Sequence, residues 1–284
     1  MISIIICSRK PDIPQSLKDN ISETIGVEYE LVVIDNSKNQ YSIFQAYNKG
    51  VDKAHGDILC FMHEDILYHT QNWGEKVVAH FKDDSLGLIG VVGTHFLPDT
   101  PSGWYNSMVV SGGCIQRETA NDENSAIEKR SLQKMDLSNS IEAVVVDGMW
   151  FCIKKGTFYK IHFDDLTFGG FHCYDLDISM QVLEIGLNVR IISDVLLEHF
   201  SYGSFDLEWL QSVELFYNKW MNKLPQIKGV EMSETEIEIR TEFVKQVMVW
   251  MKSNAFYKHE FQKIKKSKSY KIGKFLLKPL SFLK

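Results

Sequence analysis

Four continuous apolar runs, separated by amphipathic stretches, dominate the first ninety residues of the chain. The runs cover residues 2–7, 31–34, 58–62 and 86–92. Because they are continuous and do not alternate with polar residues, they are typical of strands buried on both faces of a parallel sheet. Helices are expected between them, over 14–25, 42–54 and 73–81. This β-α-β-α order predicts an α/β fold with a mostly parallel, Rossmann-like sheet and helices on both of its faces.

The second half of the chain continues the pattern less regularly. Strands are expected at 108–110, at 143–146 with a continuation over 150–153, and at 188–192. Helices are expected at 175–185, 205–221 and 233–251, and the polar segment 118–140 reads as a loop. We therefore predict one domain over residues 1–225, followed by a helical extension over 226–284 with a basic amphipathic tail.

The composition excludes several classes of protein. The chain has 284 residues, 44% hydrophobic and 24% charged, as in an ordinary globular protein. No apolar run reaches the roughly 18 residues that span a bilayer. The N-terminus has neither the basic region nor the cleavage site of a signal peptide. The five cysteines are never spaced as C-x-x-C, which indicates no zinc site or disulfide set. We therefore expect a reducing, cytoplasmic compartment.

Charge is distributed unevenly along the chain. The net charge is −6, but residues 252–284 hold ten lysines and one glutamate, a local charge of +9 that leaves −15 for the first 251 residues. An acidic body argues against nucleic-acid binding. The tail over 263–284 interleaves lysine with Phe and Leu, which predicts an amphipathic segment on an anionic membrane, at the inner face of the cell membrane. The alternatives are a solvated tail, or one folded onto the acidic body of its own or a neighbouring subunit.

Polar side chains follow the first three predicted strands. They are Ser8 and Arg9, then Asp35, then His63, Glu64 and Asp65. Ligands bind beyond the carboxyl ends of the strands in an open parallel sheet, so these side chains predict a cleft. Each one alone could instead be a solvated turn or a helix cap.

The third set of polar residues, 63–65, is the strongest indication of chemistry. Carboxylates that follow a buried strand can hold a hard divalent cation, which neutralises a diphosphate. Oxygen ligands favour Mg²⁺ or Mn²⁺, and an imidazole among them favours Mn²⁺. The alternative is a cap for a helix that follows.

The stretches 46–50 and 56–65 resemble family-2 glycosyltransferases of the GT-A fold, of the bacterial type. That family has a helix with Asn-x-Gly, then Gly, an apolar strand and a D-x-D metal motif, and His63 stands here at the first Asp position. The resemblance implies that Asp65 is a metal ligand and that Asp35 recognises the base of a nucleotide sugar. It also implies the further donor-binding residues Ser8, Arg9, Asn48, His63 and Glu64.

The segment 168–177 resembles the Glu-Asp-x-Asp segment of the same family. Tyr174 stands in place of the Glu, and Asp175 holds the position of the catalytic base, which deprotonates the acceptor hydroxyl. The alternative for Asp175 is a charge that complements the helix dipole. The resemblance also implies that His199 completes the cation site, although a lone histidine can equally belong to the core.

The segment 147–150, which follows the strand expected over 143–146, resembles the acceptor-side segment of the same family. Asp147, Trp150 and His172 are the candidate acceptor-binding residues, with Trp150 able to stack on a sugar ring or to pack in the core.

Together the motifs predict an inverting glycosyltransferase, of the hexosyltransferase type, that depends on Mn²⁺ or Mg²⁺. It would move a sugar from a nucleotide-diphosphate donor, a UDP-sugar, to a glycan or lipid-linked glycan acceptor. One alternative is a nucleotidyltransferase that makes nucleotide sugars, but residues 7–12 lack the glycine-rich loop that it needs for a triphosphate. The other alternative is a module that binds nucleotide sugars without catalysis.

Overall fold

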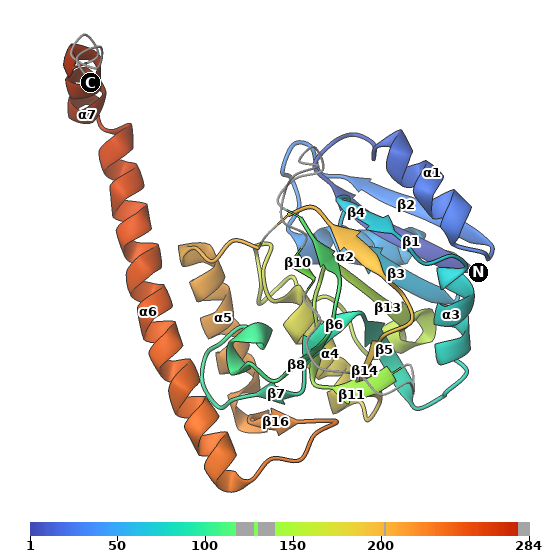
Figure 1. The fold of residues 1–284 in the computed structure, drawn as a ribbon. Coiled ribbons are helices and arrows are strands. Elements are labelled where there is room, and N and C mark those ends of the chain that lie inside the picture. The colour runs from blue at the N-terminus through green and yellow to red at the C-terminus, as the bar shows by residue number, and fades with distance from the viewer. Residues whose placement is uncertain (118–127, 130–139, 202, 278–284) are drawn as a thin grey trace.

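A computed structural model of the chain describes residues 1–117, 128–129, 140–201 and 203–277 (Figure 1). Its centre is a seven-stranded sheet in the order β11-β14-β5-β13-β3-β1-β2. The bounds of these strands are β1 Ile2–Ser8, β2 Tyr29–Asp35, β3 Ile58–Met62, β5 Leu86–Gly90, β11 Ser140–Ala143, β13 Trp150–Lys154 and β14 Asn188–Ile192.

The pairing in this sheet confirms the predicted α/β class. Strand β1 pairs in parallel with β2 and β3, and β14 pairs in parallel with β5. Strand β13 runs antiparallel between β3 and β5, and β11 runs antiparallel at the edge. Every residue of β3 and β5 is buried, as the continuous apolar runs predicted.

The helices α1 Gln15–Thr24, α2 Ile43–Lys53, α3 Trp73–His80 and α4 Tyr174–Glu184 match the predicted segments to within two residues. Helix α2 packs on β1 and β2, and α4 packs on β14 and β5. The contact between α2 and β1 depends on Gly50, because a Cβ there would lie 2.3 Å from Cγ2 of Ile5. The glycine of the Asn-x-Gly pattern therefore lets this helix approach the sheet closely.

Within the described residues, three smaller sheets flank the central one, in the orders β10-β9-β15-β4, β12-β6-β8 and β16-β7. Their strands are β4 Ile66–Tyr68, β6 Val92–Thr94, β7 Phe96–Leu97, β8 Val110–Gly112, β9 Ile115–Gln116, β10 Glu128–Lys129, β12 Val145–Val146, β15 Leu197–His199 and β16 Gln226–Ile227. Short 3₁₀ helices lie at η1 Trp104–Ser107, η2 Lys155–Tyr159 and η3 Met221–Lys223.

Three expectations about strands were wrong. The run over 86–92 is split, because β5 ends at Gly90 and β6 joins another sheet. The run over 143–146 is also split, since β11 pairs with β14 whereas β12 pairs with β6. The strand expected from Met108 begins only at Val110, because Met108 has a left-handed backbone with φ of 57°. Most of the predicted loop, at 118–127 and 130–139, lies outside the described residues.

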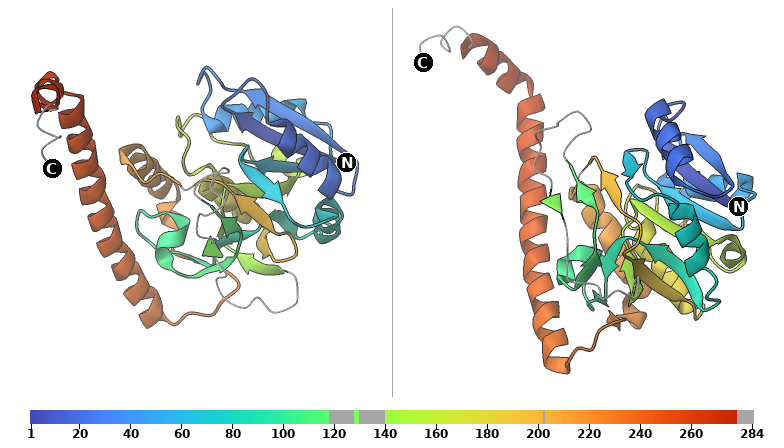
Figure 2. Two further views of the ribbon diagram at one scale, coloured as in Figure 1. Left: turned by 45° about the horizontal axis from the view of Figure 1, so that its top comes forward. Right: turned by 45° about the vertical axis from the view of Figure 1, so that its right-hand side comes forward.

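The C-terminal helices are α5 Leu207–Trp220, α6 Glu234–Lys266 and α7 Lys268–Leu277. Helix α6 is much longer than the predicted 233–251; it packs against α5 and η1 and then extends away from the domain, carrying α7 at its far end (Figures 1 and 2). Strand β16 follows the predicted domain boundary directly and pairs with β7. The division at residue 225 therefore stays a prediction, as does the tail, whose residues 278–284 lie outside the described part.

Candidate active site and cation site

The carboxyl ends of β1, β2 and β3 form a polar rim. Ser8 ends β1 and stands in register with Asp35 at the end of β2. The Ser8 hydroxyl donates to Oε2 of Glu64 at 2.6 Å, and Nε of Arg9 donates to Oε1 of Glu64 at 3.1 Å. Hydrogen bonds from Ser37 lower the pKa of the exposed Asp35. The structure thus joins Ser8, Arg9 and Glu64 in one cluster and places Asp35 beside it.

Three side chains converge next to this rim. Nδ1 of His63 lies 3.4 Å from Nε2 of His199, and Oδ1 of Asp65 lies 3.9 Å from the former and 3.5 Å from the latter. His199 reaches this position because β15 pairs antiparallel with β4, opposite Ile66. Since β4 begins directly after Asp65, the alternative of a cap for a following helix is wrong.

The hydrogen bonds of Tyr174 fix the tautomer of His63. The Tyr174 hydroxyl lies 2.8 Å from Nε2 of His63 and donates to the carbonyl oxygen of Gly148 at 3.0 Å. A hydroxyl has one proton to donate, and Tyr174 donates it to the carbonyl oxygen, which can only accept. Nε2 of His63 must therefore be protonated, and it donates a hydrogen bond to the Tyr174 oxygen. The unprotonated Nδ1 of His63 therefore faces Asp65 and His199.

Gln116 fixes the tautomer of His199 in the same way. Its amide nitrogen donates to the carbonyl oxygens of Arg117, His199 and Ser201, so its amide oxygen points to Nδ1 of His199, at 3.3 Å. That oxygen can only accept, and Nδ1 of His199 is therefore the protonated nitrogen. The other ring nitrogen, Nε2, faces Asp65 and His63.

The pKa values of His63 and Asp65 are both shifted in this cluster. Burial, followed by the neighbouring His199, lowers the pKa of His63 to about 4, so its ring is neutral near pH 7. Burial acts to raise the pKa of Asp65, but the hydrogen bond and charge of His199 and the charge of His63 hold it well below its usual range. An ionised carboxylate thus lies beside the neutral ring of His63, with Nε2 of His199 within 3.5 Å of that carboxylate.

This arrangement fits a divalent cation. Two nitrogen lone pairs that face each other at 3.4 Å repel unless a proton or a cation lies between them. A carboxylate oxygen with two imidazole nitrogens is a donor set suited to Mn²⁺ and related metals. The partners of the outer ring nitrogens, Tyr174 and Gln116, orient the imidazoles as the second layer of a metal site commonly does. His63, Asp65 and His199 could therefore hold a metal ion.

Asp175 lies in the first turn of α4 and is almost fully buried. Its Oδ2 accepts from the backbone N–H of Gly148 at 3.1 Å, and its Oδ1 accepts from that of Leu176 at 3.0 Å. Burial and then the charge of Asp147 raise the pKa of Asp175 to about 7. A carboxylate with such a pKa can accept a proton near neutral pH, which suits a general base.

Gly148 connects the candidate metal-binding side chains to Asp175. Its carbonyl oxygen accepts from Tyr174, which also contacts His63, and its N–H donates to Asp175. A side chain at Gly148 would collide with Tyr174, since a Cβ there would lie 2.4 Å from the hydroxyl oxygen. The candidate cation site and the candidate base are thus parts of one hydrogen-bonded unit.

Two predicted acceptor residues lie near this unit. Asp147 immediately precedes Gly148, is partly exposed, and acts electrostatically on both Asp175 and His63. His172 is half-buried just ahead of α4, and burial lowers its pKa.

Two other predicted site residues have structural contacts. Trp150 is fully buried, with its indole N–H donating to the Tyr68 hydroxyl at 2.9 Å, so of the two alternatives it packs in the core and does not stack on a sugar. The side-chain amide of Asn48 makes two hydrogen bonds to the backbone of Phe163. Its Nδ2 donates to the carbonyl oxygen at 2.7 Å, and its Oδ1 accepts from the backbone N–H at 3.1 Å. That pair of bonds joins α2 to the segment that follows η2, and we do not retain Asn48 among the donor contacts.

Comparison with known proteins identifies the family of the chain. A family described as glycosyltransferase-like matches residues 3–270 of the chain. The chain belongs to this glycosyltransferase-like family. A search of curated proteins gave no match.

Two solved structures share the GT-A fold of this glycosyltransferase-like chain. GalNAc-T7, solved with UDP, GalNAc and Mn²⁺, is 13% identical with a TM-score of 0.50, over 72% of this chain and 44% of its own. The mannosyltransferase PcManGT from Pyrobaculum calidifontis, solved with GDP-Man and Mn²⁺, is 12% identical with a TM-score of 0.50, over 99% of this chain and 79% of its own. At such identities the likeness establishes the fold alone.

Sequence reasoning missed several residues of this glycosyltransferase-like site. The resemblance implied that His63 contacts the donor, whereas its side chain lies with Asp65 and His199, the three residues that could hold a metal ion. The signal was present, because residues 63 and 65 are two apart after a strand and can point the same way. Gln116 gave no signal in the sequence. Half-exposed Phe171, with its ring centroid 5.8 Å from that of His63, was also missed.

Among the described residues, no helix is both long and apolar enough to cross a membrane.

Proposed function

We propose that this glycosyltransferase-like chain transfers a sugar, with inversion, from a nucleotide-diphosphate donor to a glycan acceptor. The observation that carries the proposal is the continuous link from the triad to the base, through His63, Tyr174, Gly148 and Asp175. Through this link, the proposed cation site for a diphosphate lies next to the Asp175 carboxylate, which has a pKa of about 7. A module that only binds nucleotide sugars has no need of such a base.

The proposed donor is a UDP-sugar bound along the rim of the sheet. Asp35 at the end of β2 would contact the base, and the cluster of Ser8, Arg9 and Glu64 lies between it and the triad in the order of the strands. The two similar structures were solved with UDP and with GDP-Man respectively, each together with Mn²⁺. A GDP-sugar is accordingly the second donor to test.

His63, Asp65 and His199 would hold the metal ion, Mn²⁺ or Mg²⁺. When bound, the ion supplies positive charge that stabilises the leaving diphosphate. Tyr174 and Gln116 contact the outer ring nitrogens of His63 and His199, which leaves Nδ1 of His63 and Nε2 of His199 directed at the ion.

In the proposed reaction, the acceptor hydroxyl attacks the anomeric carbon as Asp175 takes its proton. A new C–O bond forms, the bond from the anomeric carbon to the diphosphate oxygen breaks, and the nucleoside diphosphate leaves with the electron pair. Attack from the face opposite the leaving group inverts the configuration. The negative charge of Asp147 makes Asp175 a stronger base.

The proposed acceptor is a glycan or a lipid-linked glycan, as in polysaccharide assembly at the cell envelope. Asp147 and His172 are the proposed acceptor contacts, and the exposed ring of Phe171 adds an apolar surface above His63. An aromatic face of this kind suits the C–H face of a sugar ring.

We also propose that the chain works in the cytoplasm, at the inner face of the cell membrane. Lys268, Lys271 and Lys274 lie in α7, beyond the end of α6. Each basic residue near an anionic surface contributes about 1 kcal/mol to binding. The exposed side chains of Tyr270 and Ile272 provide apolar groups next to these lysines.

The experiment that tests the proposed function is a panel of nucleotide sugars screened by thermal shift, with Mn²⁺ or with a chelator. A bound donor raises the melting temperature by mass action, so one donor class is expected to do so only with the metal. The selected donor is then incubated with glycan acceptors, and the released nucleoside diphosphate is measured. A panel with no metal-dependent stabilisation, and no release, would contradict the proposal.

A further inference from the structure

Helix α6 carries an exposed apolar stripe, which we call the seam. It consists of the exposed residues Phe243, Trp250, Tyr257, Phe261 and Ile264, together with Val247, which is partly buried against the domain. Asn254 occupies the remaining position, so the spacing alternates between four and three residues throughout. This spacing is the heptad pattern of a coiled coil, in which an Asn at one core position is a common device for specifying the pairing. Trp250 and Tyr257 are 65% and 71% exposed, so neither is covered by its own domain.

The domain packs against a different face of α6. The buried residues there are Val244, Met248, Met251 and Ala255, and the helix contacts η1 and α5. The amide of Asn106 in η1, for example, lies 3.6 Å from the sulfur of Met251. With 3.6 residues per turn, this face and the seam are about 120° apart around the helix. The seam is therefore available to a partner.

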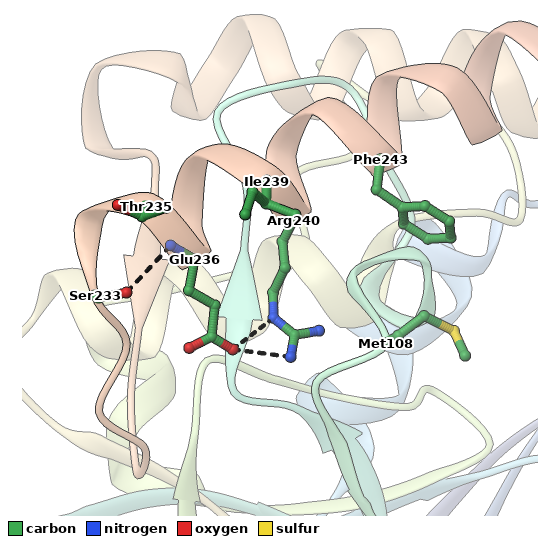
Figure 3. A pocket seen from close by; sticks show the side chains of 7 residues that line it. All are labelled: Met108, Ser233, Thr235, Glu236, Ile239, Arg240 and Phe243. Atoms are coloured by element: carbon green, nitrogen blue, oxygen red, sulfur yellow. Dashed lines mark hydrogen bonds and ion pairs between the residues drawn. The ribbon is translucent and has the colours of Figure 1, made fainter.

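A cavity of about 560 Å³ lies at the N-terminal end of the seam (Figure 3). Its walls include Met108, Ile239 and Phe243, which are all exposed apolar side chains. Glu236 and Arg240 also line it and form an ion pair at 2.9 Å. In Figure 3, Phe243 extends from the helix and Met108 from the loop that faces it, on opposite sides of the opening. The cavity can take large apolar side chains beside a charged edge.

The charge along α6 selects the partner and its direction. The first third of the helix holds Glu234, Glu236, Glu238 and Glu242 against one arginine, Arg240. The last third holds Lys258, Lys263, Lys265 and Lys266 against one glutamate, Glu260. Two parallel copies would align like charges, whereas two antiparallel copies place each basic end beside an acidic one. An anionic membrane would be repelled by the acidic third, although the seam begins there.

We propose that α6 pairs antiparallel with α6 of a second copy of this chain, about a two-fold axis near residue 252. In this register Phe243 faces Phe261 of the partner subunit, and Val247 faces Tyr257 of the partner subunit. Trp250 faces Asn254 of the partner subunit, whose amide oxygen can accept from the indole N–H. Each contact occurs twice, as a two-fold interface requires. Phe261 and Ile264 of the partner subunit fill the cavity beside Met108.

Sedimentation velocity of the full chain, over a range of micromolar concentrations, tests the pairing. We expect a dimer whose dissociation constant rises about a hundredfold in Trp250→Glu or Phe261→Glu, the scale of a buried aromatic at an interface centre. Val249→Glu is the matched control, since Val249 is 62% exposed but lies off the seam, and the dimer should persist. High salt should weaken the dimer by screening the complementary ends.

Cysteine cross-linking tests the direction, in chains that also carry Cys7→Ser because Cys7 is the one partly exposed cysteine of the described residues. Oxidation of a mixture of Phe243→Cys and Phe261→Cys chains should give a disulfide-linked dimer, whereas neither variant should cross-link alone. Cross-linking of each variant alone would overturn the antiparallel pairing. A protein that is monomeric at every concentration would overturn the dimer. Vesicle binding by the unaltered chain that is lost in Trp250→Glu would also overturn it, because the seam would then bind a membrane.

Discussion

Nε2 of His63 lies 2.8 Å from the hydroxyl oxygen of Tyr174, and this contact determines which nitrogen of His63 is free to bind a metal. The same hydroxyl donates to the carbonyl oxygen of Gly148, whose N–H donates to Asp175. Tyr174 stands where the related enzymes resembled by this sequence have a glutamate. One substituted residue thus connects the candidate metal site to the candidate base.

Replacing Tyr174 by Phe should therefore weaken metal binding without unfolding the chain. The ring remains buried, but Nε2–H of His63 loses its acceptor, and the imidazole is free to adopt the other tautomer. Loss of such an orienting partner commonly costs 10–100-fold in metal affinity. Calorimetric titration with Mn²⁺ in the presence of UDP measures the effect. An unchanged Mn²⁺ affinity would show that Tyr174 does not orient His63.

Removing a ligand should have a larger effect. Asp65→Ala should abolish Mn²⁺-dependent binding of a nucleotide sugar, because the only carboxylate of the triad is lost, and His63→Ala and His199→Ala should weaken it. The matched control is His55→Ala, since His55 is exposed and pairs with Glu30. Equal donor affinity with Mn²⁺ and with chelator, in the unaltered protein, would rule out the metal site.

The raised pKa of Asp175 predicts two opposite responses to pH. Transfer should rise with pH through about 7 and then level off, because the base must be ionised. Stability should respond in the other direction. Between about pH 4 and 7 the unfolded chain binds fewer protons at this residue than the folded chain, so the free energy of unfolding falls as pH rises.

Comparison with Asp175→Asn isolates this residue in urea unfolding. The stability of the unaltered chain relative to the variant should decrease from pH 4 to pH 7 and change little above pH 8. A difference that is constant with pH would mean that the carboxyl titrates normally.

The tail gives a separate prediction about membranes. The full chain should sediment with vesicles that contain anionic lipid at low salt and should be released at high salt, because the attraction is electrostatic. Deletion of residues 268–284 should abolish sedimentation and leave transfer to a soluble acceptor intact. Full-length protein that stays in the supernatant at low salt would contradict the membrane proposal.

The sequence predicted the parts of the fold that depend on local pattern. The buried strands β1, β3 and β5 appear as continuous apolar runs, and the polar residues after β1 and β3 meet because parallel strands end at one edge. The candidate base could be placed from its motif, at the start of a helix. Its raised pKa could not, since it arises from burial and from Asp147, which is distant in the sequence.

The remaining features depend on long-range pairing that no local pattern reveals. His199 joins Asp65 only because β15 pairs with β4, and β13 enters the sheet antiparallel between strands that precede it. The sequence alone allows Trp150 to stack on a sugar ring, and only its place in the central strand β13 shows that it is buried. Helix α6 continues for eleven residues after its last buried residue, Ala255. No periodic pattern of buried apolar residues therefore indicates where the helix ends.

Release of nucleoside diphosphate is the measurement that tests the central claim most directly. Unaltered protein and Asp175→Asn are compared with the donor selected by thermal shift and a mixture of glycan acceptors, in Mn²⁺ or in chelator. The account predicts release by the unaltered protein only with the metal, and a decrease of roughly 10²–10⁴-fold in a folded, donor-binding Asp175→Asn. Release at the same rate in the variant, or in chelator, would contradict it.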